Sequence, residues 1–254
     1  MSKPPPELAL AHAEQIAAKV HDQAAPLARD FIESRSGATP PLARCLRGGR
    51  GGEVRLKFFL SVIWMARKPP HHTTYPARAW AELLGLQDPE GNGARHIIDA
   101  VTWLTRAGFV RVERKPGKPS ILYLLDDAGT RKDYRPPHRL RRPYVKVPSC
   151  FWTKGWHTVL SGTAVALLLV MLDQQSYKPA ENSFWVSPSR AKELYALSPD
   201  TWTRGVAELR VHGLVDVVRI PVSLDFGWRR LRNTYRLNLR QLEEHPYFFE
   251  EATS

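Results

Sequence analysis

The chain has little cysteine, no long apolar run and fewer acidic than basic residues, and each shortage narrows the class of protein. Its 254 residues include only Cys45 and Cys150, too few for a disulfide framework, so we expect a reducing cytoplasm. The longest apolar run, Ala164 to Leu172, is much shorter than a membrane span, and the N-terminus lacks the apolar block of a secretory signal. These features predict a cytoplasmic protein with no membrane partner.

Signatures of catalysis and of metal binding are also scarce. The chain has no Gly-x-Ser-x-Gly motif, no His-Glu-x-x-His motif and no paired-carboxylate pattern. The His71-His72 pair lacks the intervening hydrophobic residue of the nicking-endonuclease motif, and Cys150 and His157 share no zinc spacing with Cys45. The run Arg47-Gly-Gly-Arg-Gly-Gly52 lacks the Gly-Lys-Ser/Thr ending of a nucleotide-binding loop. We therefore predict no enzyme, no cofactor and no metal site.

Basic residues outnumber acidic ones. The chain has 37 Lys and Arg against 25 Asp and Glu, which gives a formal net charge of +12 and a pI of about 10.0. This balance favours a polyanionic partner whose affinity falls as salt rises. A protein whose surface charge serves only solubility can have the same composition. Net charge alone therefore does not distinguish a polyanionic partner from this simpler interpretation.

The chain also repeats itself. Residues 76–125 begin Pro-Ala-Arg-Ala-Trp-Ala-Glu-Leu-Leu-Gly-Leu and go on to Ala100-Val-Thr-Trp-Leu-Thr-Arg-Ala-Gly-Phe-Val-Arg-Val-Glu-Arg114. Residues 188–239 begin Pro-Ser-Arg-Ala-Lys-Glu-Leu-Tyr-Ala-Leu and go on to Gly205-Val-Ala-Glu-Leu-Arg-Val-His-Gly-Leu-Val-Asp-Val-Val-Arg219. In each copy a helical apolar pattern stops at a glycine and is followed by alternating apolar residues. This pattern predicts two helices and then a hairpin, twice.

Hydrophobic spacing, first-turn prolines and helix-ending glycines place the elements of both copies. The first copy, with the segment before it, is predicted to contain helices at 54–67, 76–84 and 94–107 and strands at 109–113 and 121–125. The second copy, with the segment before it, is predicted to contain helices at 162–175, from 188 and at 199–212, and strands at 184–186, 214–220 and 234–239. Ser161, Ser187 and Ser198 are the expected N-caps. The helix at 162–175 is apolar on almost every side, so it must be covered on more than one face.

These elements predict five parts of the chain. They are an N-terminal helix and flexible basic arm over 1–53, a first domain over 54–125, a basic Pro-rich connector over 126–149, a second domain over 150–242 and a C-terminal tail over 243–254. The prolines and glycines of 36–53 predict a segment without a core, and Pro26 is expected to break the helical pattern of 7–35. The prolines of 126–149 predict an extended, semi-rigid connector.

The third helix of each copy has a polar face that suits contact with nucleic acid. Ile97, Ile98, Val101 and Leu104 are expected to face the core in the first helix, and Trp202, Val206 and Leu209 in the second. The residues left outward are Arg95, His96, Asp99, Thr102 and Arg106 in the first, and Asp200, Thr201, Thr203, Arg204 and Glu208 in the second. Arginine donates two hydrogen bonds to guanine and threonine reaches base edges, so both faces suit the major groove, as well as an ordinary solvated role. The second face is less basic, which leaves contact with protein as an alternative.

Cationic side chains also gather in the hairpin turns and in the connector. The hairpin set is Arg111, Arg114, Lys115, Lys118, Arg229, Arg230 and Arg232, and the connector set is Arg131, Lys132, Arg135, Arg139, Arg141 and Arg142. The hairpin set is expected to touch the backbone of DNA or to enter its minor groove. The connector set either follows phosphates or lies in a solvated linker.

The motif Ala100-Val-x-x-Leu-x-x-x-Gly-Phe-Val-Arg-Val-Glu-Arg114 and its echo Val206-x-x-Leu-x-x-x-Gly-Leu-Val-x-Val-Val218 resemble the recognition helix and first wing strand of winged-helix DNA-binding proteins. The resemblance covers roughly 54–125 and 155–240. It implies an α+β, mainly helical fold with two winged helix-turn-helix domains in tandem. Two such domains in one chain are similar to the architecture of plasmid replication initiators.

The resemblance implies sequence-specific binding of double-stranded DNA, by a plasmid or mobile-element replication initiator that binds iterated origin sites. The partners it implies are double-stranded DNA, further copies of the chain on iterated sites, and replication proteins, in a cytoplasmic protein associated with nucleoid or plasmid. A transcriptional repressor, a partition protein, and an adaptor whose second domain binds protein remain alternatives, and an origin nickase is the enzymatic one.

Overall fold

The computed structural model describes residues 4–21, 23–34, 36–47, 51–177, 183–225 and 228–246. In these ranges the chain is an α+β protein in which helices predominate over small antiparallel sheets, as the sequence predicted at this level.

The first sequence copy folds as repeat 1, residues 51–124. Its elements are α4 (Gly51–Met65), β2 (His72–Thr74), α5 (Ala77–Leu83), α6 (Asn92–Ala107), β3 (Val110–Glu113) and β4 (Ile121–Leu124). The strands form an antiparallel sheet in the order β2-β4-β3. Leu122 of β4 lies at its centre, opposite Thr73 on one side and Val112 on the other.

The second copy folds as repeat 2, residues 162–237, in the same order. Its elements are α9 (Gly162–Tyr177), the isolated bridge residue Phe184, α10 (Pro188–Tyr195), α11 (Pro199–Val211), β6 (Val215–Asp225) and β7 (Trp228–Leu237). Tyr235 of β7 pairs with Phe184 on one side and Val217 on the other, so it holds the place that Leu122 holds in repeat 1. The hairpin strands are longer than predicted, and the strand expected at 184–186 is reduced to a single bridge.

Caps fix where the helices of the repeats begin and end. The Oγ atoms of Ser187 and Ser198 accept the backbone N–H of Arg190 and Thr201, each at 3.1 Å, and a proline occupies the first turn of each helix. Ser161 Oγ accepts the N–H of Ala164 at 3.2 Å at the start of α9. The predicted serine caps are therefore confirmed.

The N-terminal segment is more ordered than the sequence predicted. It forms α1 (Glu7–Val20), β1 (Ala25–Ala28), α2 (Arg29–Ile32) and α3 (Pro41–Leu46). The prediction that no core forms over 36–53 is wrong, because Leu42 and Cys45 of α3 are fully buried. Their spacing of three residues places both on one helix face, a signal that the surrounding prolines and glycines obscure. A Cβ on Gly52 would lie 2.6 Å from the carbonyl oxygen of Leu46, so glycine lets α4 start against α3.

The segment 126–149 is not the extended connector that its prolines predicted. It contains the 3-10 turn η1 (Pro137–Leu140) and β5 (Tyr144–Val147), which pairs with β1, and it is followed by α7 (Cys150–Thr153) and α8 (Trp156–Val159). Val145 and Val147 alternate inward, and the Asp127 carboxylate accepts the N–H of Ala28 at 2.7 Å. Alternation of valines over only four residues was too short a signal against so many prolines and charges.

The two repeats meet along α4 and α9. The indoles of Trp64 on α4 and Trp152 on α7 are stacked, and the Nε1–H of Trp152 donates to Ser61 Oγ at 2.9 Å. Glu53 of α4 accepts the N–H of Gly162 at the start of α9, at 3.0 Å. Residues 164–171 of α9 are almost fully buried, as its apolar composition required.

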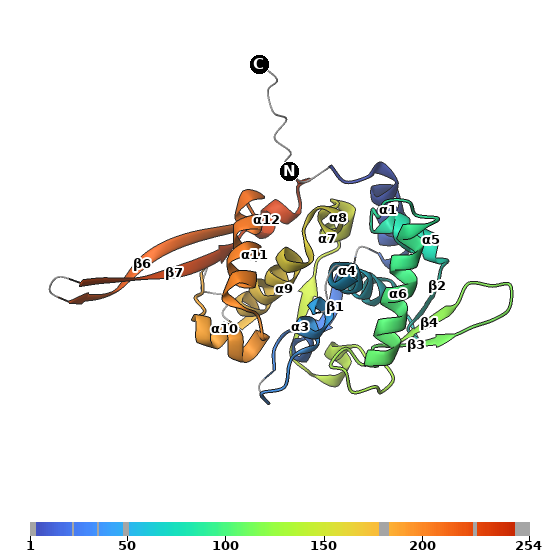
Figure 1. The fold of residues 1–254 in the computed structure, drawn as a ribbon, viewed down its shortest axis with the longest axis horizontal. Coiled ribbons are helices and arrows are strands. Elements are labelled where there is room, and N and C mark those ends of the chain that lie inside the picture. Colours follow the sequence, from blue (N-terminus) through green and yellow to red (C-terminus); the bar gives the residue numbers. More distant parts are fainter. Residues whose placement is uncertain are drawn as a thin grey trace, which may run out of the picture.

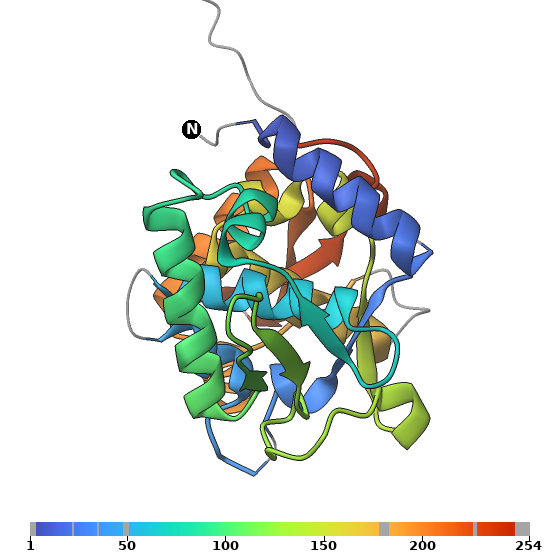
Figure 2. The same ribbon diagram turned by 90° about the vertical axis from the view of Figure 1, so that its right-hand side faces the viewer.

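The hairpins of the two repeats project from opposite ends of the molecule, β6–β7 at one end and β3–β4 at the other (Figure 1). Between them, α6 and α11 lie on the face that is toward the viewer in Figure 1. The view turned by 90° places α6 at one side of the molecule and α1 at the other (Figure 2). The short helix α12 (Leu239–Leu242) follows β7.

Candidate nucleic-acid interface

Helix α6 turns a polar face to solvent. Arg95, His96, Asp99 and Arg106 are exposed, while Thr102 is half-buried and donates its hydroxyl to the carbonyl oxygen of Ile98 at 2.8 Å. Ile97 and Leu104 are buried, as predicted. The structure thus brings four of the five predicted contacts of this helix to its open surface.

Ile98 was predicted to face the core, and this is wrong. Its side chain is 55% exposed, because it lies about 100° around the helix from Ile97, beyond the edge of the buried stripe. It instead lines a groove between α6 and the β3–β4 hairpin.

On helix α11, several of the predicted outward side chains are paired within the protein. Thr203 and Arg204 are exposed and Thr201 is half-buried, but the Arg204 guanidinium forms an ion pair with Asp200 at 2.7 Å. Glu208 does not point freely outward, because its carboxylate accepts the backbone N–H of Ser161 at 2.6 Å and bonds to the Ser161 hydroxyl. Trp202 is buried, as its apolar neighbours one and two turns on predicted.

The first hairpin carries four exposed cations of the predicted set, Arg111, Arg114, Lys115 and Lys118, and the guanidinium carbon of Arg111 lies 4.3 Å from the ring centroid of Tyr123. The Lys115 ammonium lies 3.2 Å from the carboxylate of Glu113. Hydrogen bonds from Lys115, and then from Tyr123, hold the pKa of Glu113 below its ordinary value. Lys115 is therefore exposed but already paired with an acidic side chain.

The second hairpin is described in part. Arg229 and Arg230 lie on β7 opposite Leu224 and Ser223, but their side chains lie outside the described residues. Arg232 is half-buried, and its guanidinium carbon lies 4.3 Å from the ring centroid of Trp185. This packing places Arg232 against the indole of Trp185, next to the bridge residue Phe184.

Two connector cations, Arg141 and Arg142, lie apart from the exposed face of α6, and a third, Arg131, contacts its C-terminal end. Arg141 is exposed and ends η1, which lies on the side opposite to α6 in Figure 2. Arg142 pairs with Asp126 at 3.1 Å, and Arg131 donates to the carbonyl oxygen of Arg106 at 2.9 Å, at the end of α6. The predicted contacts Arg141 and Arg142 are therefore not assembled with the helix contacts.

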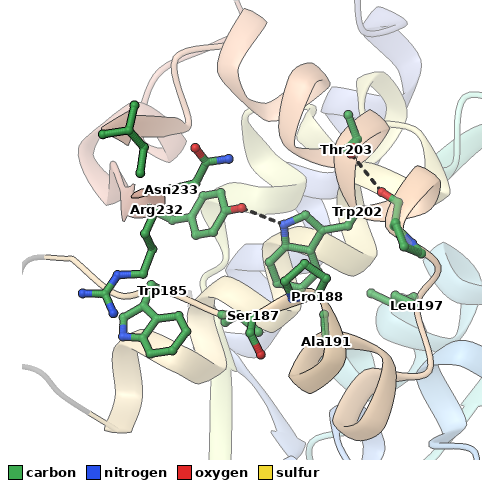
Figure 3. Close-up of a pocket in the computed structure, with 13 residues that line it drawn as sticks. Trp185, Ser187, Pro188, Ala191, Leu197, Trp202, Thr203, Arg232 and Asn233 are labelled. Carbon is green, nitrogen blue, oxygen red and sulfur yellow. Dashed lines mark hydrogen bonds between the residues drawn. The ribbon is translucent and has the colours of Figure 1, made fainter. Parts of the chain in front are cut away.

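A groove that the sequence did not predict lies between α11, α10 and β7 (Figure 3). It has a volume of about 560 Å³. Its aromatic members are Trp185, Trp202 and Tyr235, and its polar members are Ser187, Thr203, Arg232 and Asn233. The sequence placed Trp185 in the predicted strand 184–186. Side chains alternate along a strand, and the preceding Phe184 is buried, so alternation was the one signal that could have shown Trp185 to be half exposed.

Repeat 1 has a groove at the corresponding place, with a volume of about 300 Å³. It lies between α6, α5 and the β3–β4 hairpin, and its lining includes Tyr75, Trp80 and Ile98 with the cations Arg114 and Lys118 at the turn. Each repeat therefore combines an exposed helix face, a basic hairpin and a groove between them.

Over the ranges that the structure describes, no three His, Cys, Asp or Glu side chains gather as a metal site would require. In the same ranges, every helix falls short of the length and apolar content needed to cross a bilayer. Comparison with models of protein families and with curated protein sequences finds no match to this chain.

Proposed function

We propose that this protein binds double-stranded DNA in a sequence-specific way through two winged-helix domains, repeats 1 and 2. In this proposal α6 and α11 are the recognition helices and the hairpins are the wings. The biological role we favour is that of a plasmid or mobile-element replication initiator, associated with nucleoid or plasmid DNA, that binds iterated origin sites.

The observation that carries the proposal is the repeated order of helix, strand, helix, helix and hairpin, with α6 and α11 on one face of the molecule. The sheet order β2-β4-β3, and its counterpart around Tyr235, supports the same fold in both repeats. Two helices on one face suit two major-groove segments of one duplex, which lie about 34 Å apart on the same side.

The charges favour α6 as the helix that contacts base pairs of the duplex. Arg95 lies exposed in the first turns of α6, and the structure gives it no acidic partner among the described residues. A free guanidinium there can donate two hydrogen bonds to guanine. Arg114 and Lys118 lie on the adjacent hairpin turn, where backbone phosphates would pass.

One observation favours a second function, an adaptor whose repeat 2 binds protein. The one arginine in the first half of α11, Arg204, is paired with Asp200, and Glu208 is used inside the molecule. Helix α11 therefore offers little free positive charge to a duplex. An Arg204→Ala variant with unchanged DNA affinity would support the adaptor.

Footprinting of the full chain on DNA flanking its own gene tests the proposal. Protected sites that repeat at a fixed interval would support an initiator, and a single site over a promoter would support a repressor instead. Affinity that is equal for all sequences, or that does not fall with salt, would contradict sequence-specific DNA binding altogether.

A further inference from the structure

The groove of repeat 2 is built around aromatic side chains. The Nε1–H of Trp202 donates to the Tyr235 hydroxyl at 3.0 Å, so these two buried rings hold each other in place (Figure 3). Trp185 is 50% exposed at the rim, with the Arg232 guanidinium 4.3 Å from its ring centroid. One large apolar ring therefore lies open to solvent beside a fixed positive charge.

The groove of repeat 1 is different at the same places. Leu122 holds the central position of Tyr235, and Ile97 lies eleven residues before the helix-ending Gly108, as Trp202 lies eleven before Gly213. Its volume is about 300 Å³, against about 560 Å³ in repeat 2. Both grooves contain aromatic side chains, but the hydrogen-bonded Trp202–Tyr235 pair and the larger volume belong to the repeat 2 groove.

A groove of this kind is poorly matched to a duplex. Base pairs in B-form DNA hide the flat faces of the bases, and a phosphate needs cations rather than indoles. Aromatic rings combined with arginine are what proteins use to stack unpaired bases, and the volume falls within the range of small-ligand sites. The pairing of Arg204 with Asp200 also makes the neighbouring helix face a weak reader of a duplex.

We propose that the repeat 2 groove binds an unpaired base of single-stranded DNA, which stacks on Trp185 while Arg232 pairs with the adjacent phosphate. This inference rests on the proposed function, because a protein that binds duplex sites next to opened DNA meets both forms. The exposed faces of α6 and α11 then contact the duplex, and the groove beside α11 holds a separated strand.

The test uses the full chain with two probes, a twelve-residue oligothymidine labelled with fluorescein and a blunt duplex that contains the footprinted site. Trp185→Ala is expected to weaken oligothymidine binding by about five-fold or more, since stacking of one base carries ~1–3 kcal/mol. Trp185→Phe keeps a ring and should retain most of the affinity. Duplex affinity should stay within two-fold in both variants.

Leu8→Ala is the matched control. Leu8 is also 50% exposed, and it lies on α1, away from both grooves, so this variant should bind both probes as the parent does. Circular dichroism of Trp185→Ala should match the parent, because the side chain is half in solvent.

Two results would overturn the inference. One is duplex binding without measurable oligothymidine binding, and the other is oligothymidine binding that Trp185→Ala and Arg232→Gln both leave unchanged. Absence of duplex binding with oligothymidine binding intact and sensitive to Trp185 would instead overturn the proposed function and leave the groove assignment standing.

Discussion

The indole rings of Trp64 and Trp152 lie nearly parallel, with centroids 4.4 Å apart and planes inclined by 6°. Both rings are fully buried, and they join α4 of repeat 1 to the helix that leads into repeat 2. Offset stacking of buried aromatic rings adds to the burial of their apolar area. This pair therefore fixes repeat 1 against the segment that precedes repeat 2.

Replacing Trp152 should test that joint. Trp152→Ala removes the stack and leaves a cavity, so the free energy of unfolding in urea should fall by about 3–5 kcal/mol. Trp152→Phe keeps an aromatic ring but loses the hydrogen bond to Ser61 and should cost about 1–2 kcal/mol. Two separate unfolding transitions in the parent would contradict a joint that makes the repeats cooperative.

Glu208 should contribute to stability rather than to DNA reading. Glu208→Gln weakens the hydrogen bonds to Ser161 at the start of α9, so unfolding free energy should fall by about 1–2 kcal/mol. Glu193→Gln on α10 is the control, because Glu193 is exposed and forms only a 3.5 Å pair with Arg190. An equal effect of the two variants would show that the Ser161 contacts do not stabilise the fold.

The Arg204–Asp200 pair should restrain DNA binding by α11. Asp200→Asn removes the negative charge and frees Arg204, so affinity for duplex DNA should rise. The slope of log affinity against log salt concentration should also steepen, by up to about one released counterion. Glu14→Gln on α1 makes the same change in net charge away from α11 and should leave the slope unchanged. Fluorescence anisotropy at several salt concentrations measures both, and a response shared by the two variants would indicate net charge alone.

If α6 contacts base pairs of the duplex, substitutions of Arg95 and of Lys115 should change DNA binding in different ways. Arg95→Ala should reduce the discrimination between specific and random duplexes by about 1–3 kcal/mol, because a guanine contact is lost. Lys115→Ala should weaken all duplexes alike and flatten the salt slope. Competition binding with both duplexes separates these results, and equal losses for Arg95→Ala on both would remove Arg95 from base reading.

Asp127 should make stability depend on pH. Burial raises the pKa of its carboxyl from 3.8 to about 7, and the nearby Asp126 adds to the rise. The folded chain therefore holds a proton that the unfolded chain releases, so this group's contribution is full below pH 4 and is lost as pH rises through about 7.

Asp127→Asn should flatten the stability profile between pH 4 and pH 7 by a few kcal/mol at most. The parent profile also includes His157, whose pKa burial lowers to about 4 and whose slope runs the opposite way over pH 4 to 6.5. Subtracting the variant's profile from the parent's removes that contribution. A difference profile without slope in this window would show that Asp127 is charged in the folded protein.

The sequence predicted the parts of the fold that local chemistry determines. Serine caps, first-turn prolines and the glycine after α6 act within a few residues, so their patterns were sufficient to place α6, α9, α10 and α11. The β1–β5 pairing was not predictable in this way, because it joins Leu27 to Val145 across more than a hundred residues. Long-range pairing leaves no spacing signal in one short strand.

The candidate interface was predictable to the same extent. The outward positions of Arg95 and His96 follow from the helical period, whereas Ile98 lies at the edge of the buried stripe, where the period cannot decide. The pairing of Arg204 with Asp200 was readable from their spacing of four residues. The use of Glu208 by Ser161 was not, since it depends on how α11 packs against α9.

The start of α9 receives carboxylates from both sides, Glu53 from repeat 1 and Glu208 from α11. A turn of α11 relative to α6 would break at least one of these contacts, so the distance between the two helices is set before any partner arrives. If the protein binds DNA as proposed, this fixed distance selects two half-sites at one separation, and an insertion of five base pairs between them should abolish binding even where every contacted base is kept.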